Sequence, residues 1–186
     1  MWYGVGVCTE WMGFGVCCSF VDAGLVAAIL EGYSLPVLGL HGISHWGRVL
    51  SIGRRIAGLN GADPAVVEYF AVFHDSRRIN EGIDHGHGAR GAELAEAFRS
   101  RLRLTDEQLA TLMHACRHHT DGTIDGDVTV RTCWDADRLD LLRVGIRPSR
   151  TLLCTVAGKS EELRDWAMRR SVEEHVPECV GEWLQA

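Results

Sequence analysis

Two histidines and two aspartates are spaced so that they fall on the apolar faces of predicted helices. His45, His74 and Asp137 each stand three, four or seven residues from aliphatic or aromatic residues, and Asp75 directly follows His74. Such spacings bring side chains to one face of an α-helix. A single inward histidine is more often a hydrogen-bonded core residue than a ligand, but four such residues on three helices weaken that interpretation.

A carboxylate that faces the core is costly to bury without a partner, and a metal cation is a suitable partner. Neutral imidazoles together with carboxylates suit Mn, Fe, Ni, Co or Zn, with Mg as an alternative. The pattern therefore predicts a divalent metal ion held by His45, His74, Asp75 and Asp137. Three helices that converge on one ion leave coordination positions for water.

Helical phase also selects His87 and His119 as inward-facing residues. His119 stands three and seven residues after apolar residues, whereas His118 aligns with the polar side of the same helix. His87 is in phase with a leucine and a phenylalanine further along its helix, and His85 with alanines. Because the sequence does not fix the start of that helix, His85 remains an alternative to His87.

The same reasoning favours Asp137 over Asp135 and His45 over His41. Asp137 is in phase with large apolar residues on both sides, whereas Asp135 aligns with Arg138 and is expected to pair with it. His41 precedes a glycine and lies outside the phase of the helix, so we expect a local role for it. It remains the alternative to His45 as a ligand.

These residues stand on helices, because apolar residues recur with a helical period from residue 22 onward and no stretch shows the sustained alternation of a strand. We predict an all-α domain of about six or seven helices around a buried metal site. The helices are expected from Asp22 to just before Gly32, from about Ser44 to Asn60, from Pro64 through Phe73, over 87–102, after Thr105, over about 130–144 and over 160–172.

Length and charge exclude several classes of protein. The chain has 186 residues, enough for one domain with a sizeable core, and its formal charge of -6 without a run of Lys and Arg argues against coating a polymeric nucleic acid. The uncharged run 11–21 is too short to span a membrane, and residues 1–47 lack the basic residues of a signal peptide. Seven cysteines without a C-x-x-C pair are typical of a protein in the reducing cytoplasm.

We divide the chain into an N-terminal extension of uncertain order (1–21), a core (22–158) and a C-terminal helix and tail packed on that core (159–186). Glycines interrupt the apolar residues of the extension, so it shows no clear helical period. Trp183 and Leu184 are expected to close the tail against the domain or against a second copy, which leaves a homodimer as an alternative to a monomer.

His45, the doublet His74-Asp75 and the distal Asp137 resemble the H…HD…D signature of the HD-domain superfamily of metal-dependent phosphohydrolases. The surrounding sequence supports the resemblance, with H-W-x-R-V at the first motif, F-A-V-F-H-D-S-x-R at the second, and D-x-x-H-G, H-T-x-G and D-A-D-R-L-D further along. The set spans residues 41–147. The resemblance implies an HD-domain-like bundle of helices with a metal between them, and usually hydrolysis of a phosphate ester or anhydride by metal-activated water.

The resemblance also implies roles for other polar residues. His87 and His119 match histidines that some family members use for a second metal and others use to contact the substrate phosphate, so one or two ions are expected. Asp75 would accept a proton from the attacking water or orient it, and protonated His87 or His119 would offset charge on the phosphate or the leaving oxygen. Four arginines within a turn of the ligands are candidates to clamp a small, nucleotide-like phosphorylated substrate: Arg48, Arg77, Arg78 and Arg138.

Two other classes of function stay open from the sequence. The same superfamily includes oxygenases with a di-iron centre, and the six inward-facing His and Asp residues would suffice for two irons. A non-catalytic domain that binds a nucleotide or a partner protein is the third candidate. We rank it last because the ligand set is intact.

Overall fold

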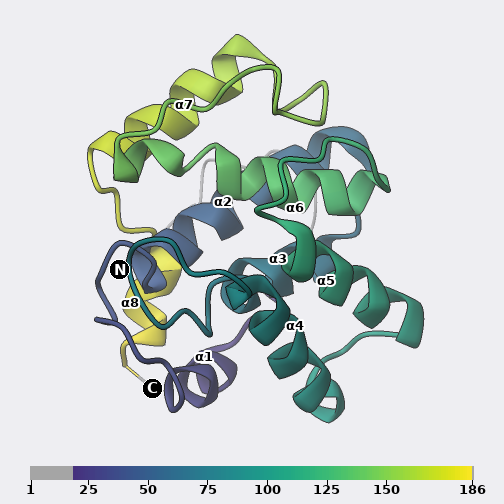
Figure 1. Cartoon of the computed structure of the whole chain (residues 1–186), viewed down its shortest axis with the longest axis vertical. Coiled ribbons are helices and arrows are strands. Elements are labelled where there is room, and N and C mark those ends of the chain that lie inside the picture. Colours follow the sequence, from purple (N-terminus) through teal and green to yellow (C-terminus); the bar gives the residue numbers. More distant parts are fainter. Residues whose placement is uncertain (1–18, 186) are drawn as a thin grey trace, which may run out of the picture.

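The computed structural model describes residues 19–185, so most of the predicted extension, residues 1–18, lies outside the described residues. Every regular element within 19–185 is helical, which confirms the predicted all-α fold (Figure 1). The elements, with η for 3₁₀ turns, are α1 (Ala23–Leu30), α2 (Ile43–Asn60), α3 (Pro64–Phe73), α4 (His87–Ala97), η1 (Arg99–Arg101), α5 (Asp106–His118), α6 (Val128–Arg138), η2 (Leu141–Val144), α7 (Glu161–Val172) and α8 (Glu178–Trp183).

The helix boundaries follow from local capping chemistry. Asp63 caps α3 by accepting hydrogen bonds from the first main-chain N–H groups, and Pro64 occupies the first helical position. Thr105 and Gln108 form a reciprocal capping box at the start of α5. Gly61 ends α2 with a φ of 74°, in the left-handed region that favours glycine. Signals of this kind act within a few residues and are therefore readable in the sequence.

The predicted helix over 130–144 is wrong in one respect, because it is two elements. α6 ends at Arg138, and the chain tightens at Asp140, whose N–H donates to the carbonyl of Asp137 at 3.0 Å before the turn η2 begins. The carbonyl of Asp140 accepts from the N–H of Arg143, three residues on, at 3.2 Å, and from the Ser171 hydroxyl of α7 at 3.0 Å. The predicted helix over 87–102 likewise ends at Ala97 and continues as the turn η1.

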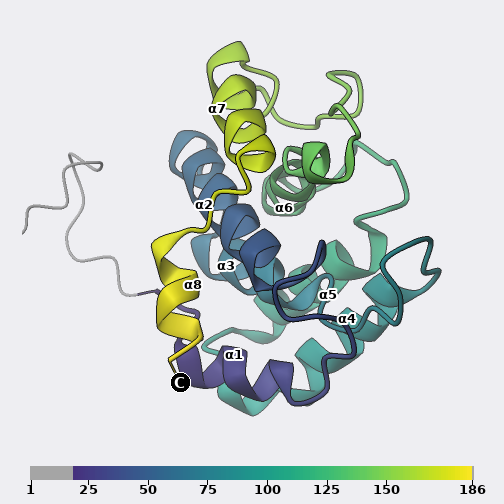
Figure 2. The same ribbon diagram turned by 90° about the vertical axis from the view of Figure 1, so that its left-hand side faces the viewer.

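Eight α-helices are present in the described chain, one or two more than predicted, because the tail forms the additional helix α8. Val180 and Trp183 of α8 are buried. α8 packs on α1 and α2, as the view in Figure 2 shows. Its six residues are too few for a helical period to be recognised in the sequence.

The core lies around α2, which contacts α3 on one side and α6 on the other (Figures 1 and 2). α5 packs on α3, α4 and α6 and lies to the right of α3 in Figure 1. Trp46, Phe70, Leu112 and Trp134, one from each of α2, α3, α5 and α6, are fully buried where these helices meet. The ends of α2, α3, α5 and α6 are thereby fixed in relation to one another.

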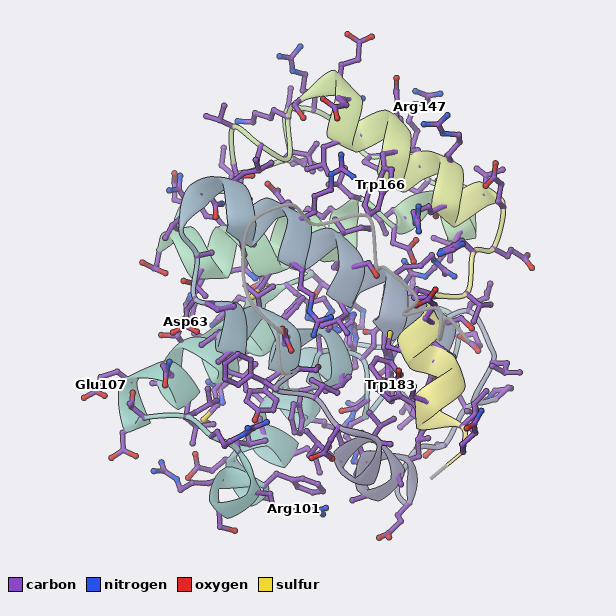
Figure 3. The ribbon with its side chains drawn as sticks, turned by 180° about the vertical axis from the view of Figure 1, so that it is seen from behind. Asp63, Arg101, Glu107, Arg147, Trp166 and Trp183 are labelled. Carbon is purple, nitrogen blue, oxygen red and sulfur yellow. The ribbon has the colours of Figure 1, made fainter. Side chains whose placement is uncertain are left out.

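Charged side chains gather at the edge of the molecule. Figure 3 shows Arg101, Glu107 and Arg147 at its periphery, and all three are exposed. None of the helices within residues 19–185 combines the length and the apolar character needed to cross a membrane.

Gly91 allows α4 to approach α3 closely. A Cβ atom at this position would clash with the carbonyl oxygen of Phe73 and would lie 3.0 Å from that of His74. We expect Gly91→Ala to lower the free energy of unfolding by about 1–3 kcal/mol, because main-chain atoms cannot rotate away from an overpacked contact. Chemical denaturation measures this change.

Gly181→Ala is the matched control for this prediction. Gly181 is also helical, but a Cβ atom there meets nothing within 4 Å. This variant should be as stable as the wild type or slightly more stable, because alanine favours helices. Equal stability of Gly91→Ala and Gly181→Ala would show that the contact between α3 and α4 is not tight.

Candidate metal centre

The ends of three helices bring His45, His74, Asp75 and Asp137 together. His45 lies in the first turn of α2, His74 and Asp75 directly follow α3, and Asp137 lies in the last turn of α6. The Nε2 atoms of His45 and His74 are 3.1 Å apart. The Asp75 Oδ2 and Asp137 Oδ1 atoms lie 3.5–3.7 Å from these two nitrogens. All four side chains are buried.

A second group adjoins the first and contains His87 and His119. Gly86 adopts a φ of 85°, and the turn that it allows makes His87 the first residue of α4. His119 directly follows α5, and its Nε2 lies 2.9 Å from that of His87. The Asp75 Oδ1 atom lies 3.2 Å from His87 Nε2 and 3.6 Å from His119 Nε2.

The Asp75 carboxylate joins the two groups, because its two oxygens point in different directions. Oδ2 faces His45 and His74, and Oδ1 faces His87 and His119. Oδ1 is buried and accepts no hydrogen bond of normal geometry within residues 19–185. A buried carboxylate oxygen without a donor is costly. A metal cation would satisfy this oxygen, and the surrounding histidine nitrogens could bind the same cation.

All four histidines are held through Nδ1 by an acceptor, so their Nε2 atoms are left facing inward. In a neutral imidazole, an Nδ1 that donates leaves Nε2 with a lone pair. The acceptors are Asp140 for His45 at 2.8 Å, the carbonyl of Phe70 for His74 at 3.1 Å, the carbonyl of Asp84 for His87 at 2.6 Å and the carbonyl of Cys116 for His119 at 2.7 Å.

The donor set fits divalent metal ions. Two Nε2 lone pairs that face each other at 2.9–3.1 Å repel unless a cation or a donor lies between or beside them. Arg78 Nη1, 3.2 Å from His87 Nε2, is such a donor for the second pair. Ligand atoms about 2.0–2.2 Å from one ion lie about 3–3.5 Å apart, which is close to the separations in both groups. Histidine held through Nδ1 by a carboxylate or a carbonyl is the usual arrangement at metal sites. His45, His74 and Asp75, with Asp137 beside them, would hold one ion, and Asp75, His87 and His119 a second.

Electrostatics keep the first group in the protonation state that metal binding requires. Burial lowers the pKa of His74 to about 3, and burial and Arg143 lower the pKa of His45. Burial acts to raise the pKa of the Asp75 carboxyl, but the imidazoles of His74, His119 and His87 outweigh it and hold that pKa well below the usual value. At neutral pH His45 and His74 are therefore neutral and the Asp75 carboxylate is charged.

Asp140, which the sequence interpretation missed as a site residue, positions His45. Its Oδ2 accepts from His45 Nδ1 at 2.8 Å, and its Oδ1 accepts from Arg48 Nε at 2.8 Å. Asp140 is fully buried. The signal was present in the sequence, because Asp140 follows Asp137 by three residues in the D-A-D-R-L-D motif.

We expect Asp140→Asn to weaken metal binding about 10- to 100-fold without removing a ligand, because an amide supports the His45 imidazole less well than a carboxylate. Competition with a chelator of known affinity measures the effect. Asp165→Asn, on the exposed side of α7, is the control and should bind metal like the wild type. Equal affinity of Asp140→Asn and the wild type would contradict a supporting role for Asp140.

The four arginines predicted to bind substrate lie in different environments. Within the described residues, Arg78 is the one of the four that forms an ion pair with a carboxylate of the metal centre. Its Nη1 lies 3.5 Å from Asp75 Oδ1. Arg48 is bound to Asp140, and Arg77 and Arg138 donate to main-chain carbonyls.

Two details of the arginine predictions are corrected by the structure. Asp135 does not pair with Arg138, because its carboxylate accepts from the main-chain N–H groups of Cys154 and Thr155 at 2.7 and 2.8 Å. Arg143, which was not predicted, reaches the cluster from η2. Its Nη2 lies 4.0 Å from Asp75 Oδ2, and its side chain is only 5% exposed.

The structure also places the histidines that were alternatives. His41 contacts Glu81, and its ring lies 6.4 Å from the ring of His45, so it stands beside the cluster rather than in it. His85 is exposed. His118 pairs with Asp121 at 2.6 Å on the outer side of α5. The inward residues are therefore the ones that helical phase favoured.

The fold and the site together define an all-helical protein with a buried His and Asp cluster for metal at the ends of its helices. The family model of the HD domain matches residues 42–142, more than half of the chain, so the chain belongs to the HD-domain family.

A similar solved structure is the crystal structure of a predicted HD superfamily hydrolase from an uncultured Thermotogales bacterium. It is 25% identical in sequence, the similarity covers 88% of this chain and 87% of that chain, and the TM-score is 0.55. No curated protein matches the chain significantly.

Proposed function

We propose that this protein is a metal-dependent phosphohydrolase that acts on a small, nucleotide-like phosphate ester or anhydride. One observation carries the proposal: two buried guanidinium groups flank the ligand carboxylate. Arg78 lies 3.5 Å from Oδ1 of Asp75, and Arg143 lies 4.0 Å from Oδ2. A guanidinium group can donate two parallel hydrogen bonds to the oxygens of one phosphoryl group. Such contacts stabilise both a bound substrate and the charge that develops during its cleavage.

The charges around the cluster support an anionic substrate. The carboxylates of Asp75 and Asp137 balance the guanidinium groups of Arg78 and Arg143, while Arg48 balances Asp140. Each divalent ion bound to neutral histidines then adds two positive charges to a buried site. A phosphate dianion offsets that charge, whereas a neutral substrate leaves it uncompensated.

Each residue near the metal would have its own role in the reaction. A divalent ion in this site would lower the pKa of water and polarise a phosphoryl oxygen. Asp75 would orient the attacking water, and Arg78 and Arg143 would hold the remaining phosphoryl oxygens. Burial acts to lower the pKa of His119, but the nearby carboxylates of Asp75 and Asp137 outweigh it and raise that pKa. With one ion bound, His119 Nε2 can therefore hold a proton for the leaving oxygen.

The similarity to a predicted hydrolase agrees with this proposal. A screen of phosphorylated metabolites with protein loaded with Mn²⁺, Fe²⁺, Co²⁺, Ni²⁺ or Zn²⁺ tests it. We expect release of inorganic phosphate that chelation removes and metal restores. Two irons per chain with consumption of O₂ and no phosphate release would favour an oxygenase. Tight nucleotide binding without turnover and without bound metal would favour a binding domain.

A further inference from the structure

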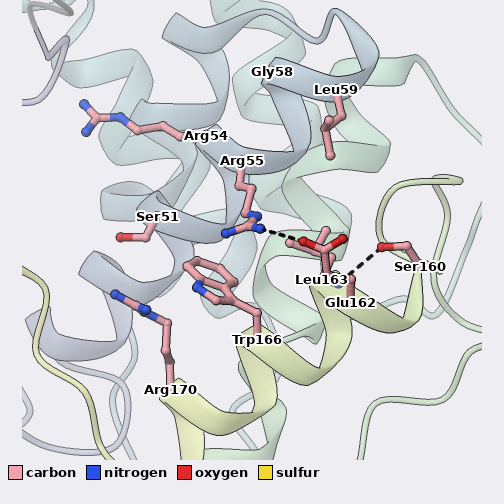
Figure 4. A pocket seen from close by; sticks show the side chains of 10 residues that line it. All are labelled: Ser51, Arg54, Arg55, Gly58, Leu59, Ser160, Glu162, Leu163, Trp166 and Arg170. Carbon is pink, nitrogen blue, oxygen red and sulfur yellow. Dashed lines mark hydrogen bonds and ion pairs between the residues drawn. The ribbon is translucent and has the colours of Figure 1, made fainter. Parts of the chain in front are cut away.

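A cavity of about 570 Å³ lies between the second half of α2 and α7, apart from the metal centre (Figure 4). It is lined mainly by polar and charged side chains. The lining holds three arginines, Arg54, Arg55 and Arg170, and a single carboxylate, that of Glu162. A lining with this composition attracts anions.

The only lining carboxylate is a weak competitor for the arginines. Glu162 lies 3.2 Å from Arg55, but its side chain is 87% exposed. Ion pairs that are open to water contribute little, so an anion with better geometry displaces this one readily. Arg54 is already paired with buried Glu68 at 2.8 Å.

Trp166 orders the other two arginines. Figure 4 shows its indole between the guanidinium groups of Arg55 and Arg170. Each guanidinium carbon lies 4.7 Å from the centroid of the indole ring. Stacking on an aromatic ring fixes the guanidinium plane and leaves its N–H groups free at the edge. Less side-chain entropy is then lost when an anion binds.

A chain of hydrogen bonds also holds Arg170 in place. It donates to Nε2 of His175 at 2.9 Å, and the carbonyl of His175 accepts from Arg48 at 3.2 Å. Arg48 in turn supports Asp140 beside the metal ligand His45. The Nε atom of Arg170 is buried and has no hydrogen-bond partner within residues 19–185.

We propose that this cavity is a second, non-catalytic binding site for a small polyanion with two linked phosphate groups. One phosphate group binds the edge of the Arg55 guanidinium in place of Glu162, and the other binds Arg170. Trp166 sets the spacing between them. The ligand thereby contacts the outermost member of the chain of hydrogen bonds that ends at His45.

Calorimetric titration of the full-length protein with inorganic pyrophosphate tests the proposal. Arg55→Ala and Arg170→Ala should each weaken binding at the cavity at least about tenfold, because each removes charge-assisted hydrogen bonds. Arg147→Ala removes the same charge from an exposed position outside the cavity and should bind like the wild type. Asp75→Asn, which impairs the metal centre, should retain this binding and so separates the two sites.

Two results would overturn the proposal. One is the absence of pyrophosphate binding to Asp75→Asn, whether or not the wild type binds it. The other is unchanged affinity in both Arg55→Ala and Arg170→Ala with circular dichroism spectra like that of the wild type. Arg55 is partly exposed, so its variant is expected to fold even if the Arg170 variant does not.

Discussion

Replacing Asp75 with asparagine is expected to remove the bound metal and to lower phosphate release by about a thousandfold or more. The two oxygens of this carboxylate face the two groups of histidines, so the substitution takes a ligand from both. It also leaves Arg78 and Arg143 without their shared partner. Elemental analysis of the purified variant and a phosphate-release assay measure the two effects.

Asp121→Asn is the control for this substitution. Asp121 also pairs with a histidine, His118, but on the exposed side of α5. This variant should keep the metal content and the activity of the wild type. If Asp75→Asn retained both metal and phosphate release, Asp75 would not be the carboxylate that joins the two groups.

Replacing Arg143 with alanine should lower kcat/KM for phosphate release about 100-fold while the metal content stays that of the wild type. The expected loss corresponds to one charge-assisted contact made to the phosphoryl group in a site with little water. Arg143 is nearly buried and lies beside Asp75 and Asp140, yet it is not a metal ligand. Steady-state kinetics together with elemental analysis separate loss of substrate binding from loss of metal.

The comparison with Arg147→Ala shows whether position or charge matters. Arg147 follows η2 closely in the sequence but is exposed (Figure 3). Its substitution should change kcat/KM less than twofold. A similarly small change in Arg143→Ala would mean that the guanidinium groups at the cluster do not contact the substrate, and it would remove the main support for a phosphorylated substrate.

Much of the site could be predicted because its residues occupy regular helical positions. His119 was preferred over His118 from the spacing of apolar residues alone, and the structure places His119 against Asp75. His45 and Asp137 were placed in the same way. Helical phase works at these positions because each residue lies within a helix or directly at its end, where a 3.6-residue period still fixes the direction of a side chain.

The arginines could not be predicted in the same way. Arg143 lies beyond the break after α6, so the phase of that helix does not fix the direction of its side chain. Arg48 and Arg138 lie close to ligands in the sequence, but Asp140 and two main-chain carbonyls take up their guanidinium groups. Which acceptor an arginine finds depends on the tertiary fold, because its long side chain reaches several turns of neighbouring helices.

The metal centre is tested most directly by the anomalous scattering of crystals grown with Mn²⁺. We predict one difference peak among the Nε2 atoms of His45 and His74 and the carboxylates of Asp75 and Asp137. At full loading a second peak is expected beside His87 and His119, on the Oδ1 side of Asp75. A map without a peak at either group, from crystals in which elemental analysis finds manganese, would contradict the assignment of this cluster as the metal centre.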